Sequence, residues 1–416
     1  MFPSKAWTVE NCSMENVTFS HNMPAASLPY NFSEPYTCVE LDNSTGAKAI
    51  DGTNYKFYFN PGQGSGKKKF MIYWQGGAFC GSDGLPVLES CYEKLDMMYG
   101  TSSTQFWEAN GTSFNETAPW GMFSSTKEFN PLFSDWFKIR MLPLDGANYQ
   151  GSLEEPVVWN GTEMWFRGFN NTMATIDYMQ NHYDLFNATE IVLSGGSAGG
   201  IAAMIWASYL KDIFPSHIKI TLMIDGGLFL DAYSPGSHCY LFRFMKQQLV
   251  ETFQLNNSEL YKNCRYKDTE LWKCLMIEYI YEDCEYPVFF SNSQTDTFEL
   301  SNLMGITCIL NGGPDMCNSK ERKAINNVRE KFLTTTLTMK KNKPTWGYWL
   351  RSCFEHSLQF CWAWYGHSMD VFNAETQETE NIRNALYAWY LGEANHTSFI
   401  DLIDWLHNPR CVYYFE

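Results

Sequence analysis

The feature that most constrains the fold of this 416-residue chain is Ile191–Gly200, which reads Ile-Val-Leu-Ser-Gly-Gly-Ser-Ala-Gly-Gly. An apolar run typical of a buried strand ends in glycines around Ser197, and Ile201–Ala207 favours a helix directly afterwards. The pattern G-x-S-x-G in this position is typical of a strand that turns sharply into a helix. Such a turn exposes the serine Oγ above the sheet, so Ser197 is the candidate nucleophile.

The same five-residue pattern also arises by chance in glycine-rich turns that hold an incidental serine. Two features favour catalysis here, namely the strand before Ser197 and the helix after it. The glycines have no Cβ atoms, so they permit a strained turn and a close crossing of helix and strand. The N-terminus of the helix would direct free N–H groups at an oxyanion next to the serine.

Further strand and helix patterns alternate along the chain. Strands are expected at Tyr55–Phe59, Phe70–Trp74, Trp136–Met141, Ile218–Ile224 and Val288–Ser291, and helices at Thr172–His182 and Asn381–Leu391. Alternation of this kind predicts an α/β fold with a mostly parallel central sheet and helices on both faces. We therefore expect an α/β-hydrolase-like architecture with a cap-like insertion.

The domain organisation is predicted to be simple. Residues 1–44 are rich in Asn, Ser and Pro and are expected to form an irregular arm, which a Cys12–Cys38 disulfide would clip. No linker interrupts the remainder, so residues 45–416 are predicted to form a single catalytic domain. The cap insertion is expected at roughly 232–285. A hairpin-like loop is expected at 62–69.

An acyl-transfer serine needs donors that stabilise an oxyanion. The strand Phe70–Trp74 runs into Gln75-Gly76-Gly77, where two adjacent glycines allow backbone N–H groups to approach a substrate closely. In this fold an early loop supplies one donor, and the residue after the nucleophile supplies the other. The candidate oxyanion hole is therefore formed by the N–H groups of Gly76, Gly77 and Ala198.

The residue pattern leaves two candidates for the base and two for the acid. Histidine bases follow the serine in this fold, and His356 and His367 are the main candidates. His356 lies close to Cys353, so a disulfide could hold its loop. Asp296 follows the strand-like run at Val288–Ser291, where the orienting carboxylate belongs, but Asp225 also ends a strand.

Charge and composition exclude several classes of protein. The net charge of −16 argues against a nucleic-acid partner, since no basic stripe could displace counterions. No run of about 18 apolar residues is present, so no membrane-spanning segment is expected. The chain lacks C-x-x-C and H-E-x-x-H motifs, so we expect neither a metal nor another cofactor.

Cysteines and glycosylation sequons predict a secreted protein. The chain has 13 cysteines, many for a cytosolic enzyme, and the odd number leaves at least one thiol without an intramolecular partner. Eleven Asn-X-Ser/Thr sequons indicate N-glycans, at Asn11, Asn16, Asn31, Asn43, Asn110, Asn115, Asn160, Asn170, Asn187, Asn256 and Asn395. The first residues lack the apolar run of a signal peptide and so give no support of their own for export. The cysteines and the sequons are therefore the features that predict an extracellular or secretory-lumen location.

A set of ordered motifs is more specific than the serine turn. The motifs are Asp51-Gly52-Thr53, Gly76–Cys80 with Cys91, Asn130-Pro131, Asp145-Gly146-Ala147 with Gly151, Phe166-Arg167-Gly168, Ser194–Gly200, Asp225–Asp231, Cys274-Leu275, Pro287–Asp296 and Ser352–His356. In these motifs the chain resembles the pectin acetylesterase/Notum family of α/β hydrolase-type carboxylesterases, from about Asp51 to His356.

The resemblance implies roles that the residue pattern leaves open. It implies that Asp296 is the acid and His356 the base, and that Cys80–Cys91 and Cys264–Cys274 are disulfides. A Cys308–Cys317 pair is suggested by spacing. The chain departs from the family pattern at Gln75 and Ala78-Phe79, beside the glycine pair, and at Gly196, where plant members tend to have cysteine. The first departure affects the expected acyl pocket.

The predicted function is that of a secreted serine carboxylesterase that works through Ser197, His356 and Asp296 without a cofactor. The expected substrate is an O-acetyl group on a polysaccharide. One alternative is Notum-like removal of longer acyl chains from protein or lipid. A second alternative is a non-catalytic glycan-binding protein, which has no need of all three side chains. The expected partners are thus an acylated carbohydrate or an acylated protein.

Overall fold

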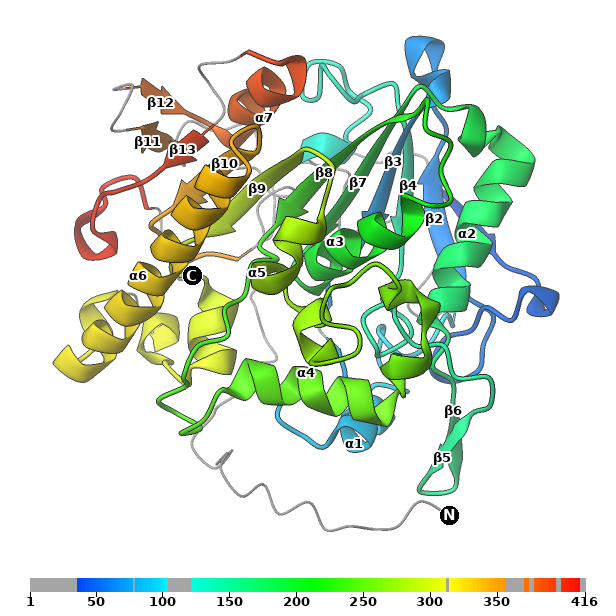
Figure 1. Ribbon diagram of the computed structural model, residues 1–416, viewed down its shortest axis with the longest axis horizontal. Coiled ribbons are helices and arrows are strands. Elements are labelled where there is room, and N and C mark those ends of the chain that lie inside the picture. Colours follow the sequence, from blue (N-terminus) through cyan, green and yellow to red (C-terminus); the bar gives the residue numbers. More distant parts are fainter. Residues whose placement is uncertain are drawn as a thin grey trace.

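The centre of the molecule is a nine-stranded sheet (Figure 1). The computed structural model describes residues 36–77, 79–103, 121–311, 314–356, 370–373, 378–393 and 398–411. Across the sheet the strands are β1 (Thr37–Glu40), β2 (Lys56–Asn60), β4 (Phe137–Met141), β3 (Lys69–Trp74), β7 (Glu190–Gly196), β8 (Lys219–Asp225), β9 (Val288–Ser293), β10 (Gly347–Arg351) and β13 (Ser398–Ile400).

Most of the sheet is parallel. Every pair from β4 through β3, β7, β8, β9 and β10 to β13 is parallel, whereas β1, β2 and β4 are joined by antiparallel pairs. A parallel interior strand is buried on both faces and therefore has a continuous apolar run. Ile191, Val192 and Leu193 of β7 satisfy this requirement, since all three are fully buried. The carboxyl ends of the parallel strands thus meet at one edge.

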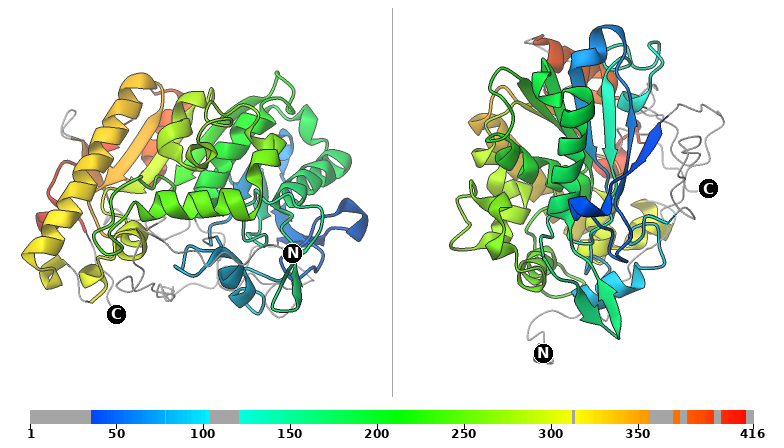
Figure 2. Two further views of the ribbon diagram at one scale, coloured as in Figure 1. Left: turned by 60° about the horizontal axis from the view of Figure 1, so that its bottom comes forward. Right: turned by 90° about the vertical axis from the view of Figure 1, so that its right-hand side faces the viewer.

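Helices cover both faces of the sheet (Figure 2). Alternate side chains of β3 belong to two separate apolar cores, with Ile72 in one and Met71 in the other. The first core is packed by α3 (Ala198–Leu210), which contacts β3, β7 and β8, and the second by α7 (Ile382–Leu391). The remaining helices are α1 (Val87–Glu93), α2 (Gly168–Tyr183), α4 (Leu241–Thr252), α5 (Ile277–Ile280) and α6 (Ser319–Asn342).

The predicted α/β fold is confirmed. The expected strands correspond to β2, β3, β4, β7, β8 and β9, and the three expected helices correspond to α2, α3 and α7. Two short hairpins lie outside the main sheet, β5 (Val157–Trp159) with β6 (Thr162–Met164) and β11 (Val371–Asn373) with β12 (Glu378–Glu380). No helix within the described ranges combines the length and apolarity needed to cross a bilayer.

Two local expectations were wrong. The loop at 62–69 does not close a hairpin, because β4 lies between β2 and β3 in the sheet. The arm is not irregular throughout, since Thr37–Glu40 forms β1 and pairs with β2. Residues 1–35 of the arm lie outside the described ranges. The pairing of β1 satisfies backbone groups at the edge of the sheet that would otherwise be exposed.

The expected cap region connects β8 to β9 and contains α4 and α5. Helix α4 contacts α1, and α5 contacts α3, so this segment covers the side of the molecule where those helices lie (Figure 1). A disulfide between Cys264 and Cys274 closes a short loop within it. The division of the chain into one catalytic domain with a cap at 232–285 remains a prediction.

Candidate active site

The serine predicted as nucleophile lies at the end of β7, where the chain turns directly into α3. Ser197 has φ 55° and ψ −129°, a backbone conformation that residues other than glycine rarely adopt. Its N–H donates a hydrogen bond of 2.8 Å to the carbonyl of Asp225 at the end of β8. Strain of this kind persists only where the surroundings enforce it, and it recurs at functional sites. The turn has the shape of a nucleophile elbow.

The glycines around Ser197 are required by steric contact with the backbone. A Cβ atom on Gly195 would lie 2.1 Å from the carbonyl oxygen of Gly199, and one on Gly199 would lie 1.9 Å from that of Trp74. A Cβ atom on Gly76 would lie 3.0 Å from the Cβ of Ser197. The loop after β3 is therefore in close contact with the serine.

A hydrogen-bonded acid–base pair lies at the carboxyl ends of the adjacent strands β9 and β10. His356 Nδ1 lies 2.7 Å from Asp296 Oδ2. The other carboxylate oxygen, Oδ1, accepts a hydrogen bond of 3.0 Å from the N–H of Glu299. The Asp296 side chain is buried and that of His356 is 9% exposed, and the ring centres of Phe229 and Phe298 lie 5.9 and 5.6 Å from that of the imidazole. The pair is thus shielded from water.

The charge around His356 favours the imidazolium. Burial alone lowers the pKa of His356, but the negative charge of Asp296, its hydrogen bond and the nearby Asp225 outweigh burial. The pKa of His356 is therefore raised above its usual 6.5. In a serine hydrolase the orienting acid is a carboxylate that stabilises the imidazolium in this way.

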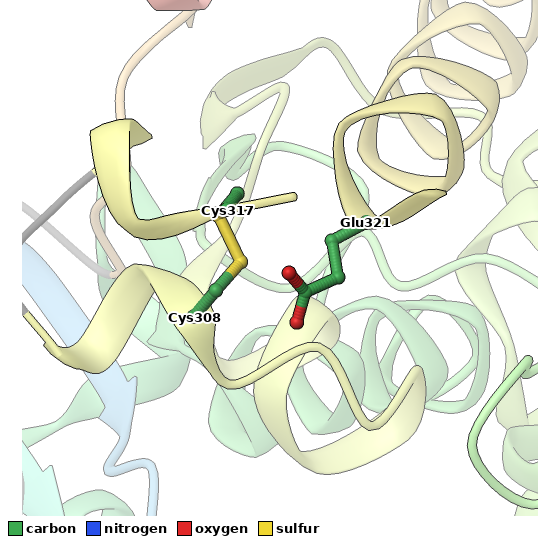
Figure 3. A group of neighbouring side chains, drawn as sticks. All are labelled: Cys308, Cys317 and Glu321. Carbon is green, nitrogen blue, oxygen red and sulfur yellow. A yellow bond between two sulfur atoms is a disulfide. The ribbon is translucent and has the colours of Figure 1, made fainter. Parts of the chain in front are cut away.

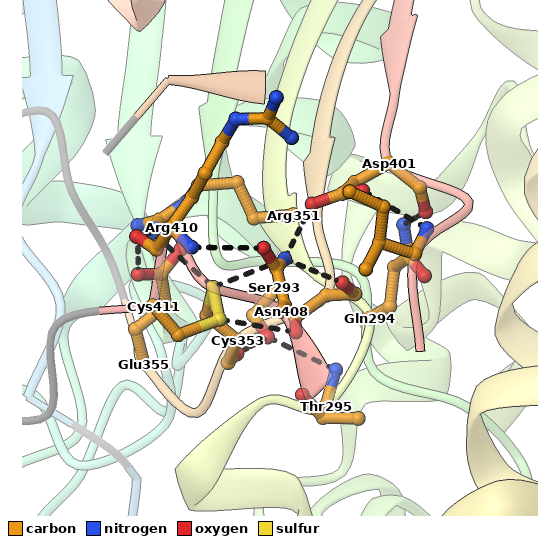
Figure 4. The surroundings of a disulfide bond; sticks show 12 residues. Ser293, Gln294, Thr295, Arg351, Cys353, Glu355, Asp401, Asn408, Arg410 and Cys411 are labelled. Atoms are coloured by element: carbon orange, nitrogen blue, oxygen red, sulfur yellow. Dashed lines mark hydrogen bonds and ion pairs between the residues drawn. A yellow bond between two sulfur atoms is a disulfide. The ribbon is translucent and has the colours of Figure 1, made fainter. Parts of the chain in front are cut away.

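The segment between β10 and His356, which we call the histidine loop, is fastened from several directions (Figure 4). Cys353 forms a disulfide with Cys411, and its carbonyl accepts a hydrogen bond of 2.5 Å from the Ser293 hydroxyl. Arg351, almost fully buried, pairs with Glu355, whose carbonyl accepts a hydrogen bond from Thr297. These contacts connect the histidine loop to the segment that holds Asp296.

Two further buried carboxyls lie near this pair. Burial, reinforced by the charge of Asp296, raises the pKa of Glu299 to about 8. Burial also raises the pKa of Glu355 to about 7, although Arg351 opposes the shift. The Glu299 side chain accepts a hydrogen bond of 3.0 Å from the N–H of Leu230. No pattern in the sequence marks these two residues, because their environments depend on neighbours distant in the chain.

The expected oxyanion donors are positioned on two segments next to Ser197. Ala198 is the first residue of α3, so its N–H has no partner within the helix. Gly77 has φ 149°, and a Cβ atom there would lie 2.6 Å from the ring of Tyr99. Gly76 lies against Ser197, as described above. Their use as oxyanion donors remains a proposal.

The three proposed catalytic side chains follow β7, β9 and β10, so they share one edge of the sheet. Among the described residues, no hydrogen bond joins the Ser197 hydroxyl to His356. Such bonds are often formed only in the substrate complex. The rival acid Asp225 lies nearby, but the hydrogen bond to His356 comes from Asp296. The rival base His367 lies outside the described residues.

The cysteines largely follow expectation. The expected disulfides Cys80–Cys91, Cys264–Cys274 and Cys308–Cys317 are confirmed, and Cys353–Cys411 supports the idea of a fastened histidine loop. The prediction of a Cys12–Cys38 disulfide was wrong, because Cys38 is a free thiol. Cys38 lies on β1 and makes a side-chain hydrogen bond with Tyr58. Cys284 is a second free thiol, and it is buried.

One cluster resembles a metal-binding set by distance alone. Cys308, Cys317 and Glu321 lie close together (Figure 3). The two cysteines form a disulfide, so neither can offer the thiolate that a metal would bind. This cluster therefore does not fit a metal site.

The parallel sheet, the strained serine turn and the buried Asp–His pair define a protein of the α/β hydrolase type. The chain matches the family Pectinacetylesterase over residues 29–412, and it belongs to that family.

Individual relatives agree with this assignment. Pectin acetylesterase 5 of Arabidopsis thaliana is 26% identical over 417 residues, which cover 94% of this chain and 89% of the relative. Palmitoleoyl-protein carboxylesterase Notum of Schmidtea mediterranea is 24% identical over 82% of this chain and 61% of the relative. The crystal structure of the Wnt deacylase Notum from Drosophila matches with a TM-score of 0.71 and 18% identity, covering 91% of this chain and 100% of that one. The protein is a carboxylic ester hydrolase.

Proposed function

We propose that this enzyme is a serine carboxylesterase whose triad is Ser197, His356 and Asp296. The observation that most supports the proposal is the hydrogen bond of 2.7 Å between His356 and the buried Asp296, at the same edge of the sheet as the strained Ser197 turn. With Nδ1 engaged by Asp296, the second ring nitrogen, Nε2, is left to accept the serine proton.

The proposed reaction follows from these positions. His356 takes the proton of Ser197 while the serine Oγ attacks the ester carbonyl, and Asp296 stabilises the imidazolium. The N–H groups of Gly76, Gly77 and Ala198 stabilise the oxyanion of the tetrahedral intermediate. The imidazolium then gives its proton to the leaving alcohol, and an acyl-enzyme remains. Water, activated by His356, releases the acid and restores the serine.

The proposed substrate is an O-acetyl group on a polysaccharide. The family and the similarity to pectin acetylesterase 5 favour this class. The similarity to Notum, named a palmitoleoyl-protein carboxylesterase, supports a longer acyl chain as the second candidate. Phe79 departs from the family pattern and is buried beside the glycine loop. This departure affects the expected acyl pocket, and therefore the choice between an acetyl group and a longer acyl chain.

We also propose that the enzyme is secreted and glycosylated. Four disulfides within the described residues favour an oxidising compartment. The sequon asparagines Asn43, Asn160, Asn187 and Asn256 are exposed and therefore open to glycosylation.

The proposal is tested by Ser197→Ala, with Ser216→Ala at an exposed loop position as the matched control. Hydrolysis of nitrophenyl acetate and release of acetate from acetylated pectin and xylan should fall on the order of 10³-fold or more in Ser197→Ala only. A Ser197→Ala enzyme with near-parental turnover would refute the triad. A series of nitrophenyl esters of increasing chain length decides between acetyl and longer acyl groups.

A further inference from the structure

The buried carboxyl group of Glu299 belongs to the same turn of the chain as the proposed acid, Asp296. Glu299 is 1% exposed, and its N–H donates a hydrogen bond of 3.0 Å to Asp296 Oδ1. The Asp296 carbonyl also accepts a hydrogen bond of 2.9 Å from the N–H of Leu300, which closes the turn. The backbone of Glu299 is therefore fixed to the acid.

The side chain of Glu299 reaches a second segment of the chain. Its Oε1 accepts a hydrogen bond of 3.0 Å from the N–H of Leu230, in the segment after β8. Leu230 and Glu299 each directly follow a phenylalanine, Phe229 and Phe298 respectively. These two rings pack beside the imidazole of His356, and their own ring centres lie 5.6 Å apart. The Glu299 side chain thus joins the two segments that flank the base.

Glu299 differs from other buried carboxyls of this region because it lacks an arginine partner. Asp231 pairs with Arg243, and Glu355 pairs with Arg351. Within the described part of the chain, Glu299 forms no ion pair. An ionised carboxylate that is buried without a partner costs far more free energy than a neutral carboxyl group in the same place.

The charged groups that face Glu299 come from its own turn and from two helices. Asp296 lies on the turn, with His356 hydrogen-bonded beyond it, while Glu278 lies on α5 and Lys331 on α6. Lys331 Nζ lies 3.7 Å from Glu278 Oε2 and is partly exposed, so its charge acts only weakly on Glu299. Burial and the two carboxyls outweigh it and raise the pKa of Glu299 to about 8. Its carboxyl group is therefore uncharged at neutral pH.

We propose that Glu299 is a positioning residue for the acid–base pair, and this rests on the proposed triad. Its uncharged carboxyl group holds the Phe229 segment against the Asp296 turn and adds no second negative charge to that turn. Loss of the proton puts two carboxylates on one turn. Repulsion between them, and the hydration that the new charge requires, then loosen the packing beside His356.

The test compares kcat/KM for nitrophenyl acetate from about pH 5 to about pH 10 in the wild-type enzyme, Glu299→Gln and Glu299→Ala. Glutamine offers the same acceptor without an ionisable proton. In the wild-type enzyme kcat/KM should fall above pH 8, whereas Glu299→Gln should show no such fall. Glu299→Ala leaves the Leu230 N–H unpaired and should lower kcat about tenfold at neutral pH, a loss that glutamine restores. Glu251→Gln, exposed on α4, is the matched control and should follow the wild-type profile.

Thermal unfolding in a Ser197→Ala background tests the charge of Glu299 without any catalysis. The unfolded chain releases this proton near pH 4.5 and the folded protein only near pH 8, so folding loses stability as pH rises between these values. Glu299→Gln removes that loss. The Tm of Glu299→Gln should therefore exceed that of its parent by an amount that grows from pH 4.5 to pH 8 and then stays constant.

Three results would overturn the role of Glu299 and leave the triad intact. The first is a pH–rate profile of Glu299→Gln that superimposes on the wild-type profile. The second is an acid limb that moves in Glu299→Gln, because Glu299 would then be charged at neutral pH. The third is a Tm difference that does not change with pH. Absence of nitrophenyl acetate hydrolysis in the wild-type protein would instead refute the esterase proposal, and the Tm comparison would still show whether Glu299 is uncharged.

Discussion

At the scale of single residues, the candidate site depends on steric exclusion around Ser197 and on charge around His356. A Cβ atom on Gly195 or Gly199 would overlap backbone atoms, so the turn at Ser197 requires glycine at both positions. The residue pattern left His356 and His367 open, since histidine has no local signature of catalysis. Only the carboxylate that faces the imidazole distinguishes His356 within the described residues.

The residue-scale prediction concerns Asp296→Asn. The base must be neutral, so the raised pKa of His356 places the acid limb of kcat/KM above pH 6.5. Replacing the Asp296 carboxylate by an amide removes the charge that raises the pKa of His356 against the effect of burial. The pKa of His356 should therefore fall, and the acid limb should move to lower pH. Turnover should fall by about 10⁴-fold, because the imidazolium loses its stabilising partner. A pH–rate profile measures both effects.

Asp225→Asn provides the control, since Asp225 also raises the pKa of His356 but less strongly. It should move the acid limb by less and retain more turnover than Asp296→Asn. The opposite order of effects would identify Asp225 as the orienting acid.

At the scale of elements, the long buried strands could be predicted because their apolar runs are continuous. Strand β1 was missed because it lies in a segment rich in polar residues and depends on pairing with β2. The loop between β2 and β3 was interpreted as a hairpin, but the sheet inserts β4 between them. Local sequence does not encode which strand a neighbour will pair with, so the short connection 61–68 joins two strands that are not adjacent in the sheet.

The element-scale prediction concerns the disulfide Cys353–Cys411, which closes a separation of 58 residues and holds the histidine loop. The double variant Cys353→Ser with Cys411→Ser should lose about 4 kcal/mol of unfolding free energy, on the chain-entropy estimate. Turnover should also fall, because His356 lies three residues from the lost anchor. Urea unfolding and nitrophenyl acetate kinetics measure the two effects.

Cys308–Cys317 closes only 9 residues and serves as the control. The corresponding double serine variant should lose about 2.5 kcal/mol and retain its turnover. Equal turnover in the two double variants would mean that the Cys353–Cys411 bond does not position the histidine.

At the scale of the whole molecule, the fold brings together parts of the chain that are far apart. Ser197, Asp296 and His356 follow strands β7, β9 and β10, and the parallel direction of those strands puts all three at one edge. The class of fold could be predicted from alternating strands and helices. The contact between the segment after β8 and the site could not be predicted, because the aromatic packing of Phe229 on His356 depends on long-range geometry.

The central claim is that Ser197 is an activated nucleophile within this assembly. The most direct measurement is mass spectrometry of the protein after reaction with a fluorophosphonate. We predict a single adduct on the peptide that contains Ser197, no adduct in Ser197→Ala, and much slower labelling in His356→Gln. An adduct on another residue, or undiminished labelling of Ser197→Ala, would contradict the account.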